Sequence, residues 1–218
     1  NFNVKNEPNN KVNVGPTESM SKSKKNTVDP EKIIKNYGAD AVRLFILSDS
    51  PPEKDVQWSD QGMVASYKFI QKFWLLHKRI MTKISLKEEN QNSESIDSFT
   101  NTLIDKITKN LERFHYNVIV ANFHEAYNFL IKEIEKPINN LNLIENYKKI
   151  LILLQPVIPH FALECLEEID SKYKAEWPPI NLKLIKKETF NIVVQINGKK
   201  RGLLVCESET TEEQLIGK

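Results

Sequence analysis

The 218-residue sequence has few of the residues that build disulfide-rich, zinc-binding or membrane proteins. Its two cysteines, Cys165 and Cys206, stand far apart and belong to no Cys-x-x-Cys pair, which argues against a disulfide framework and a zinc site. Such cysteine usage fits a reducing cytoplasm. The longest apolar run, Ile150 to Leu154, is far shorter than the ~20 residues of a membrane helix, and no secretory signal is visible. We therefore predict a cytoplasmic protein that holds no metal and has no membrane partner.

The sequence also lacks a large excess of charge of one sign. Lysine and arginine together number 31 and aspartate and glutamate 29, which gives a net charge of +2. Mixed charge of this kind excludes a histone-like binder, so any contact with nucleic acid must come from local patches. Only four of the basic residues are arginines. Because lysine attracts phosphate as a point charge and lacks the planar fork suited to base edges, backbone contact is favoured over base reading.

What the sequence does contain is a short basic loop, Ser19-Met20-Ser21-Lys22-Ser23, followed at once by Lys24-Lys25. A lysine between two serines can meet a polyphosphate with a charge and hydroxyl donors together. Asp29-Pro30 then starts a helix, because aspartate accepts the free N–H groups of the first turn and proline has no N–H to lose. Taken alone, such a run is more often a solvated linker or a basic targeting patch.

The residues that follow decide between these interpretations. Tyr37-Gly38-Ala39-Asp40 comes next, and Pro51-Pro52 and then Trp58-Ser59-Asp60 precede a long helical pattern. In this order the segments resemble the leucyl-tRNA synthetase family, and the resemblance continues into Val193–Gly202. The loop is similar to the Lys-Met-Ser-Lys-Ser signature of class I aminoacyl-tRNA synthetases, with Ser19 in place of the first lysine. The valine, isoleucine and methionine families share the loop and the Tyr-Gly-Ala-Asp step, so they stay an alternative.

The resemblance implies a reaction in two steps. Leucine is activated by ATP with release of pyrophosphate, and the leucyl group is then transferred to tRNA(Leu). Lys22 matches the family's catalytic lysine. The resemblance places Met20, Ser21, Lys22 and Ser23 at the ATP phosphates, with Mg²⁺ expected to accompany ATP and no protein ligand for it in these residues.

Two further expectations concern the loop itself. We expect Met20 to anchor the loop by packing. Lys24 and Lys25 are candidates to replace some of the charge lost at Ser19. Because the loop carries no glycine, its mobility should come from a hinge at its ends, and the loop should close over ATP after binding.

The other half of a class I active site, a His-x-Gly-His segment on a nucleotide-binding fold, is missing from the sequence, as is an editing domain. Leucine is therefore expected to bind through a missing N-terminal half. Because the first residue is Asn1 rather than methionine, we interpret the chain as a C-terminal fragment that is inactive alone. The rival hypothesis is a stand-alone helical RNA-binding module that has lost catalysis and keeps the loop as a relic.

The hydrophobic periodicity predicts a mainly α protein with short helices leading into a helical bundle. We expect residues 1–60 to be the end of the catalytic domain with its loop, 61–180 an anticodon-binding-like bundle, and 181–218 the start of a truncated α/β tRNA-binding domain with a β-hairpin. The predicted core stripes of the bundle are Met63, Tyr67, Ile70, Trp74, His77 and Met81; Ile96, Phe99, Leu103, Ile107, Leu111 and Phe114; Val118, Phe123, Tyr127, Leu130 and Ile134; and Leu143, Tyr147, Ile150, Leu154, Phe161, Cys165 and Ile169.

Local signals predict where several elements begin and end. A helix from Pro30 to about Tyr37 should stop at Gly38, which permits a left-handed cap. Asp40 is expected to cap a second helix, which Pro51-Pro52 ends. The later elements are a weak strand at Lys11–Val14, a hairpin with strands Phe190–Ile196 and Arg201–Val205 around a turn at Asn197-Gly198, and a last helix from Thr210.

Two sets of basic residues are candidates for tRNA contact. Lys199, Lys200 and Arg201, clustered at the hairpin, are the better candidates for the tRNA backbone. A second set on the bundle either lines a groove that follows the backbone or is an ordinary solvated face: Lys68, Lys72, Lys78, Arg79, Lys106, Lys109 and Arg113. The isolated histidines are interpreted as core or interface residues rather than catalytic ones: His77, His115, His124 and His160.

Overall fold

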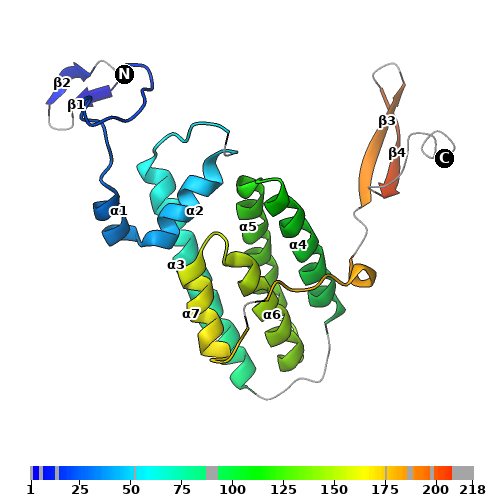
Figure 1. Cartoon of the computed structure of the whole chain (residues 1–218). Helices are drawn as coiled ribbons and strands as arrows, with labels where there is room; N and C mark the ends of the chain where they lie inside the picture. The colour runs from blue at the N-terminus through cyan, green and yellow to red at the C-terminus, as the bar shows by residue number, and fades with distance from the viewer. Residues whose placement is uncertain are drawn as a thin grey trace. The chain divides into compact units, whose positions relative to one another are not determined.

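The computed structural model describes residues 2–4, 7–12, 15–51, 53–86, 93–174, 176–185, 189–196 and 199–207. The chain falls into two compact units, residues 1–38 and 39–218, and each is described by itself. Helices dominate, which confirms the mainly α prediction (Figure 1). In chain order the elements are β1 (Phe2–Val4), β2 (Glu7–Val12), α1 (Pro30–Tyr37), α2 (Ala39–Asp49), α3 (Asp60–Ser85), α4 (Glu94–Glu112), α5 (Tyr116–Glu133), α6 (Asn140–Leu154), α7 (Pro159–Ile169), the 3₁₀ turn η1 (Leu182–Leu184), β3 (Thr189–Ile196) and β4 (Lys199–Glu207).

The first unit pairs β1 with β2 in an antiparallel ribbon and ends in α1. α1 begins and ends where the sequence predicts. Asp29 caps the helix by accepting a 3.1 Å hydrogen bond from the Glu31 amide, and Pro30 occupies the first turn. Gly38 follows with φ +81°, a left-handed conformation that favours glycine, and its N–H donates to the Ile34 carbonyl.

The predicted role of Asp40 as the cap of α2 is wrong. α2 begins at Ala39, so Asp40 lies inside its first turn, and its carboxylate accepts the Phe161 amide at 2.7 Å at the start of α7. Arg43, one turn later on α2, donates to the carbonyl of Val157 at 2.9 Å and also to that of Pro156. Asp40, the last residue of the Tyr-Gly-Ala-Asp step, and Arg43 therefore hold α2 on the turn between α6 and α7, more than 100 residues away.

The Trp-Ser-Asp segment forms the junction between α2 and α3. Trp58 packs edge-on against Phe45 with 5.3 Å between ring centroids, and its indole N–H donates to Asp60 at 2.9 Å. Ser59 caps α3 by accepting the Gly62 amide at 3.1 Å. A Cβ at Gly62 would lie 2.6 Å from the Phe45 ring, so the bare glycine allows the two helices to approach closely. The segment that indicated the family is thus a packing element.

Helices α2 to α7 form one bundle around a single apolar core. α4 packs against α5 and α6, α6 against α7, and α2 against α3 and α5 (Figure 1). The predicted stripe on α6 and α7 is confirmed, and Tyr147 at its centre is fully buried. Other fully buried apolar side chains of the core include Phe73, Ile80, Ile96, Ile104, Ile107, Ile119, Phe123, Leu130, Leu143, Ile150, Leu154 and Cys165.

The predicted stripe on α3 is wrong by a rotation of the helix. Tyr67, Ile70 and Trp74 are only partly buried, because apolar residues also occupy the adjacent face of α3 and that face turns into the core. Met63 and His77 are shared by the predicted and the observed sets. The buried face consists of Met63, Ser66, Phe69, Phe73, Leu76, His77 and Ile80.

Two residues predicted in core stripes instead lie exposed at the turn between α4 and α5. Phe114 is 60% exposed and has φ +57°, and Val118 is 40% exposed. The left-handed residue lets the His115 amide reach back to the Asn110 carbonyl and the Phe114 amide to the Leu111 carbonyl, which satisfies the end of α4. The position of Phe114 is therefore set by the backbone geometry of this short turn and not by the hydrophobicity of its side chain.

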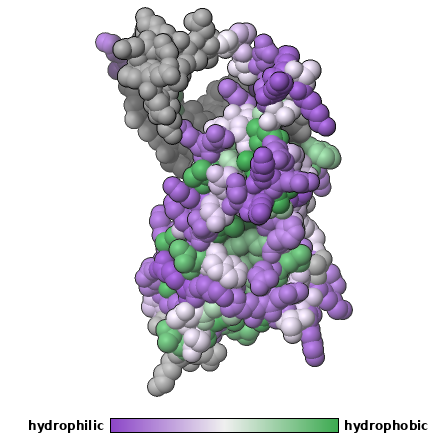
Figure 2. All heavy atoms as spheres, turned by 90° about the vertical axis from the view of Figure 1, so that its left-hand side faces the viewer, coloured by the Kyte–Doolittle hydropathy of each residue, from purple (hydrophilic) through white to green (hydrophobic). Residues whose placement is uncertain are grey.

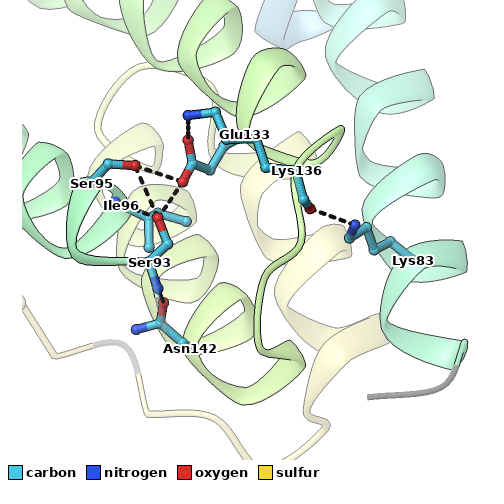
Figure 3. Close-up of polar contacts among 7 residues, drawn as sticks. All are labelled: Lys83, Ser93, Ser95, Ile96, Glu133, Lys136 and Asn142. Carbon is cyan, nitrogen blue, oxygen red and sulfur yellow. Dashed lines mark hydrogen bonds and ion pairs between the residues drawn. The ribbon is translucent and has the colours of Figure 1, made fainter. Parts of the chain in front are cut away.

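A buried carboxylate ties the ends of three helices together (Figure 3). Glu133, only 1% exposed, accepts hydrogen bonds from the hydroxyls of Ser93 and Ser95 at the start of α4. Lys136 pairs with the same carboxylate at 2.7 Å, and its carbonyl accepts the Lys83 ammonium from α3. Burial by itself would raise the pKa of Glu133, but the bonds from Lys136 and the two serines outweigh it and hold that pKa below its usual value.

A second buried polar network crosses the centre of the bundle. His77 is fully buried and lies 3.1 Å from the Tyr147 hydroxyl through Nδ1 and 3.1 Å from the Glu168 carboxylate through Nε2. Lys78 pairs with the same carboxylate, and burial, together with the neighbouring Cys165, raises the pKa of Tyr147. Burial raises the pKa of the Cys165 thiol to about 12, so it stays protonated. His77 is the satisfied core histidine that the sequence predicts.

After α7 the chain runs back along α4. The Trp177 indole donates to the Thr108 hydroxyl at 2.9 Å, and the Asn181 amide donates to the Asn101 side chain at 2.8 Å. η1 packs on α4 beyond this point. These contacts fix the segment that leads to the hairpin, because both partners stand on one rigid helix.

The predicted hairpin is confirmed. β3 and β4 pair antiparallel from Thr189 opposite Glu207 to Ile196 opposite Lys199. The predicted turn at residues 197–198 and the predicted helix from Thr210 lie outside the described residues.

Candidate phosphate-binding loop and basic surfaces

The loop that the sequence singles out is folded into two overlapping tight turns. The Lys24 amide donates to the Ser21 carbonyl and the Lys25 amide to the Lys22 carbonyl, each at 3.2 Å. The hydroxyls of Ser21 and Ser23 lie 3.1 Å apart on the same side of these turns. The two hydroxyls, with Lys22 between them in the sequence, therefore lie on one short stretch of hydrogen-bonded backbone.

The three lysines of the loop differ in what they contact. Lys24 pairs with Glu18 at 2.9 Å, in an exposed pair of the kind that contributes little stability. Lys22 is exposed and, within the described residues, its ammonium group has no partner. Lys25 has φ +53°, a conformation that L side chains rarely adopt. Within the described residues, the charge of Lys22 is thus available to a ligand without breaking an ion pair, whereas that of Lys24 is not.

Backbone donors are available beside it. In the part of the chain that the structure describes, the amides of Lys22 and Ser23 donate to no acceptor. Consecutive free amides in a turn are suited to anion binding, because their partial positive charges point the same way. Met20 is 47% exposed, so the packing predicted for it is not made within the described residues.

Sequence reasoning missed Asn26. Its side-chain carbonyl accepts the Ser21 amide at 2.8 Å, and its side-chain amide donates to the Ser19 carbonyl at 3.3 Å. One carboxamide therefore spans the mouth of the loop. Because its partners are backbone groups several residues away, no residue pattern marks them.

The predicted tRNA-contact residues of the hairpin lie at the start of β4. Lys199 and Arg201 are exposed, and the register shifts between Lys200 and Gly202, so Arg201 is the extra residue of a bulge in β4. Lys200 stands opposite Gln195 in the register. The placement of these residues is compatible with backbone contact, and their role stays a prediction.

The basic set on the bundle divides into paired and available residues. Lys78, Arg79, Lys106 and Lys109 each form an ion pair with a carboxylate. The remaining members, Lys68, Lys72 and Arg113, are exposed. The face in Figure 2 is mostly hydrophilic, with hydrophobic residues in separate patches. More than half of the proposed groove charge is therefore neutralised by neighbours on the bundle.

The other histidines also fail to form a catalytic group. The His124 ring packs against Phe69 at a tilt of 42°, with 4.1 Å between ring centroids, and burial together with the nearby Lys72 lowers its pKa. His160 contacts Asp40 at the start of α7. Within the described residues, no cluster of three or more His, Cys, Asp or Glu could hold a metal ion. Among the same residues, no helix is long and apolar enough to cross a bilayer.

Comparison with known families gives two matches along the chain. Residues 13–59 match the family of class I tRNA synthetases for isoleucine, leucine, methionine and valine, and residues 94–216 match the anticodon-binding domain of tRNA ligases. The second match covers more than half of the chain, which therefore belongs to the family of tRNA ligase anticodon-binding domains.

The relatives are of the leucine type. The chain is 35% identical to the leucine–tRNA ligase of Bradyrhizobium sp. strain ORS 278 and 36% identical to that of Wolbachia pipientis subsp. Culex pipiens. Each alignment covers 94% of this chain but only 25% and 26% of those proteins, respectively, so the chain spans about a quarter of their length. This confirms the family that the sequence motifs indicate.

A solved structure shares the fold. The chain superposes with a TM-score of 0.71 and 26% identity on LeuRS of Agrobacterium radiobacter K84 (agnB2), determined as a ternary LeuRS–tRNA–LeuAMS complex. The match covers 91% of this chain and 26% of that one.

Proposed function

We propose that this chain works as part of a leucine–tRNA ligase that activates leucine with ATP and transfers it to tRNA(Leu). The observation that carries the proposal is the loop, where, within the described residues, Lys22 has no ion-pair partner, the amides of Lys22 and Ser23 donate to no acceptor, and the hydroxyls of Ser21 and Ser23 lie 3.1 Å apart. The leucine-type relatives support leucine over the other aliphatic amino acids. Within this reading, residues 1–60 are the end of the catalytic domain, 61–180 the bundle and 181–218 the start of a tRNA-binding domain.

The loop's chemistry follows from where charge develops in the first step. A carboxylate oxygen of leucine attacks the α-phosphorus of ATP, and the bond from that phosphorus to the bridging oxygen breaks as pyrophosphate leaves with the electron pair. In this proposal Lys22 neutralises the charge that accumulates on the leaving phosphates, and Ser21 and Ser23 donate to their oxygens. Interactions that strengthen as this charge forms accelerate the step.

Mg²⁺ is expected to arrive with ATP. The loop offers one carboxylate, Glu18, and it is already paired with Lys24. Since Mg²⁺ commonly takes substrate phosphates and waters as ligands with few protein groups, the loop's role is to hold the phosphates rather than the ion.

The bundle and the hairpin are proposed to support tRNA through its phosphates. Lys199, Lys200 and Arg201 are the candidate contacts at the hairpin, and Lys68 and Lys72 are the best remaining ones on the bundle. The ammonium groups attract backbone without reading bases, so the anticodon sequence should have little influence.

The test is amino-acid-dependent ATP–pyrophosphate exchange by the ligase that contains this chain. Exchange should depend on leucine and be far weaker with isoleucine, valine or methionine. The 218-residue chain alone should give no exchange, because it has no His-x-Gly-His segment. Absence of leucine-dependent exchange in the ligase would favour the catalytically inactive RNA-binding alternative, and preference for another amino acid would reassign the substrate.

A further inference from the structure

The side chain of Asn26 closes the loop from the outside. Its carbonyl oxygen accepts the Ser21 amide at 2.8 Å, and its NH₂ group donates to the Ser19 carbonyl at 3.3 Å. One side chain therefore holds both ends of the segment from Ser19 to Ser21. The Asn26 side chain thus links a backbone amide to a backbone carbonyl, and neither group lies in a helix or a strand.

These two bonds act on the residues that face a phosphate. With the Ser21 amide fixed, the Ser21 hydroxyl accepts the Lys24 amide at 3.3 Å and lies 3.1 Å from the Ser23 hydroxyl. Lys22 lies between these two serines, at the tip of the turn. The position of the Lys22 backbone is thus set by a chain of bonds that begins at Asn26.

Apart from these bonds and the two backbone bonds of its turns, few contacts among the described residues hold the loop. Met20 and Lys22 are exposed, Lys25 is in a left-handed conformation, and the Lys24–Glu18 pair is exposed to solvent. A loop with no packed side chain samples many conformations unless local hydrogen bonds restrict them. Restricting them before ATP binds removes an ordering cost that would otherwise be met in the transition state.

We propose that Asn26 is a positioning residue for leucine activation: its carboxamide pre-orders the loop so that Lys22 and the two serine hydroxyls meet the leaving phosphates. This rests on the proposed function. Asn26 itself touches no reacting atom and acts through Ser21 and the backbone of Lys22.

The experiment uses the full ligase and compares Asn26→Ala with Thr27→Ala, an exposed polar neighbour outside the bonded loop. Asn26→Ala should lower the turnover number of ATP–pyrophosphate exchange about tenfold, the loss expected for two neutral hydrogen bonds, while the Michaelis constant for leucine and the melting temperature stay unchanged. Thr27→Ala should match the parent enzyme.

A double-mutant cycle separates positioning from a general structural role. If Asn26 acts through Lys22, Asn26→Ala should cost less than threefold in the Lys22→Ala background, because the group being positioned is already gone. Full turnover in Asn26→Ala, or an equal loss in both backgrounds, would overturn the proposal. Absence of exchange in the parent ligase would instead reject the proposed function and is measured first.

Discussion

The carboxylate of Asp40 on α2 caps α7 from outside that helix. Its Oδ2 accepts the Phe161 amide at 2.7 Å, and its Oδ1 lies 2.8 Å from His160 Nδ1. The residue that precedes α7, Ile158, offers no side-chain cap of its own. Asp40 therefore replaces the local cap. It joins α2 to α7 by accepting a backbone amide at the start of α7 that has no partner within that helix.

Replacing this cap should destabilise the bundle. Asp40→Ala should lower the free energy of unfolding by about 1–2 kcal/mol, since it removes the acceptor of a helix N-terminus that is mostly buried. Asp40→Asn should cost less, because one acceptor oxygen remains. Chemical denaturation of the 218-residue chain measures both, with Asp49→Ala, at the exposed end of α2, as the control. Equal stability of Asp40→Ala and the parent would remove the cap from the account.

Arg43 should couple to Asp40 because both hold the same turn. Arg43→Ala removes the bonds to Val157 and Pro156, so the turn is partly released before Asp40 is changed. The double variant should therefore lose less than the sum of the single losses, with a difference of at least 0.5 kcal/mol as is usual for groups in one network. Strict additivity in the same denaturation experiment would mean that the two residues hold the turn independently.

The network at His77 predicts a stability that falls in mild acid. Burial is the main cause that lowers the pKa of His77 below 6.5, with Glu168 opposing it, so the folded chain binds fewer protons than the unfolded one. The free energy of unfolding should then decrease as the pH falls below about 6.5, until the pH passes the lowered value. His77→Gln should flatten this decrease between pH 7 and 5, and His115→Gln, an exposed control, should not.

The tyrosine of this network should be needed at neutral pH as well. Tyr147→Phe leaves Nδ1 of the buried His77 without its hydroxyl partner, which should cost about 1–3 kcal/mol. The loss is measured by thermal unfolding at pH 7. A Phe variant as stable as the parent would show that water or another group satisfies the ring nitrogen.

Replacing Phe114 should stabilise the chain, in contrast to the substitutions above. Because its φ is +57° and its ring is largely exposed, Phe114→Gly should raise the free energy of unfolding by about 0.5–1 kcal/mol. Arg113, its neighbour, has φ −96°, so Arg113→Gly should lower stability by a similar amount. Loss of stability in Phe114→Gly would mean that contacts of the ring outweigh the backbone strain.

How far the sequence predicted the structure depended on how local each signal was. α1 was predicted to the residue because Asp29, Pro30 and Gly38 act within one turn. The face of α3 was not, since aromatic and aliphatic residues occupy two adjacent faces and only contacts with other helices choose between them. Asp40 was assigned to the wrong helix because its partners lie about 120 residues away.

The site followed the same rule. Lys22 and the serines around it were singled out from the sequence because their residue types suit a polyphosphate, and their role stays a prediction. The sequence could not show that Lys24 pairs with Glu18 while Lys22 stays available, because this depends on how the turns place the side chains. The role of Asn26 could not be predicted, because a side chain that bonds to backbone groups leaves no pattern of complementary residues in the sequence.

The hairpin's role in tRNA binding is tested by its dependence on salt. Each neutralised phosphate releases condensed counterion, so the logarithm of the binding constant should fall with the logarithm of salt by about 0.7–0.9 per contact. Replacing Lys199, Lys200 and Arg201 together by alanine should flatten this slope by up to about three contacts' worth. Filter binding across salt concentrations provides the slope. Binding that ignores salt, or that discriminates strongly among anticodon variants, would place the contact on base-reading groups elsewhere.

The most direct test of the account is the rate of leucine activation by Lys22→Ala and Lys24→Ala ligases. The two residues lie in the same loop and carry the same charge, but Lys24 is paired with Glu18, whereas Lys22 has no ion-pair partner within the described residues. Lys22→Ala should lower the turnover number of leucine-dependent ATP–pyrophosphate exchange by about 100-fold or more, the loss of about 2.7–4 kcal/mol of transition-state stabilisation, with little change in leucine affinity. Lys24→Ala should stay within a few-fold of the parent. An unchanged turnover number in Lys22→Ala, with only a raised Michaelis constant for ATP, would contradict the account, because Lys22 would then bind ATP without stabilising the charge that forms as pyrophosphate leaves.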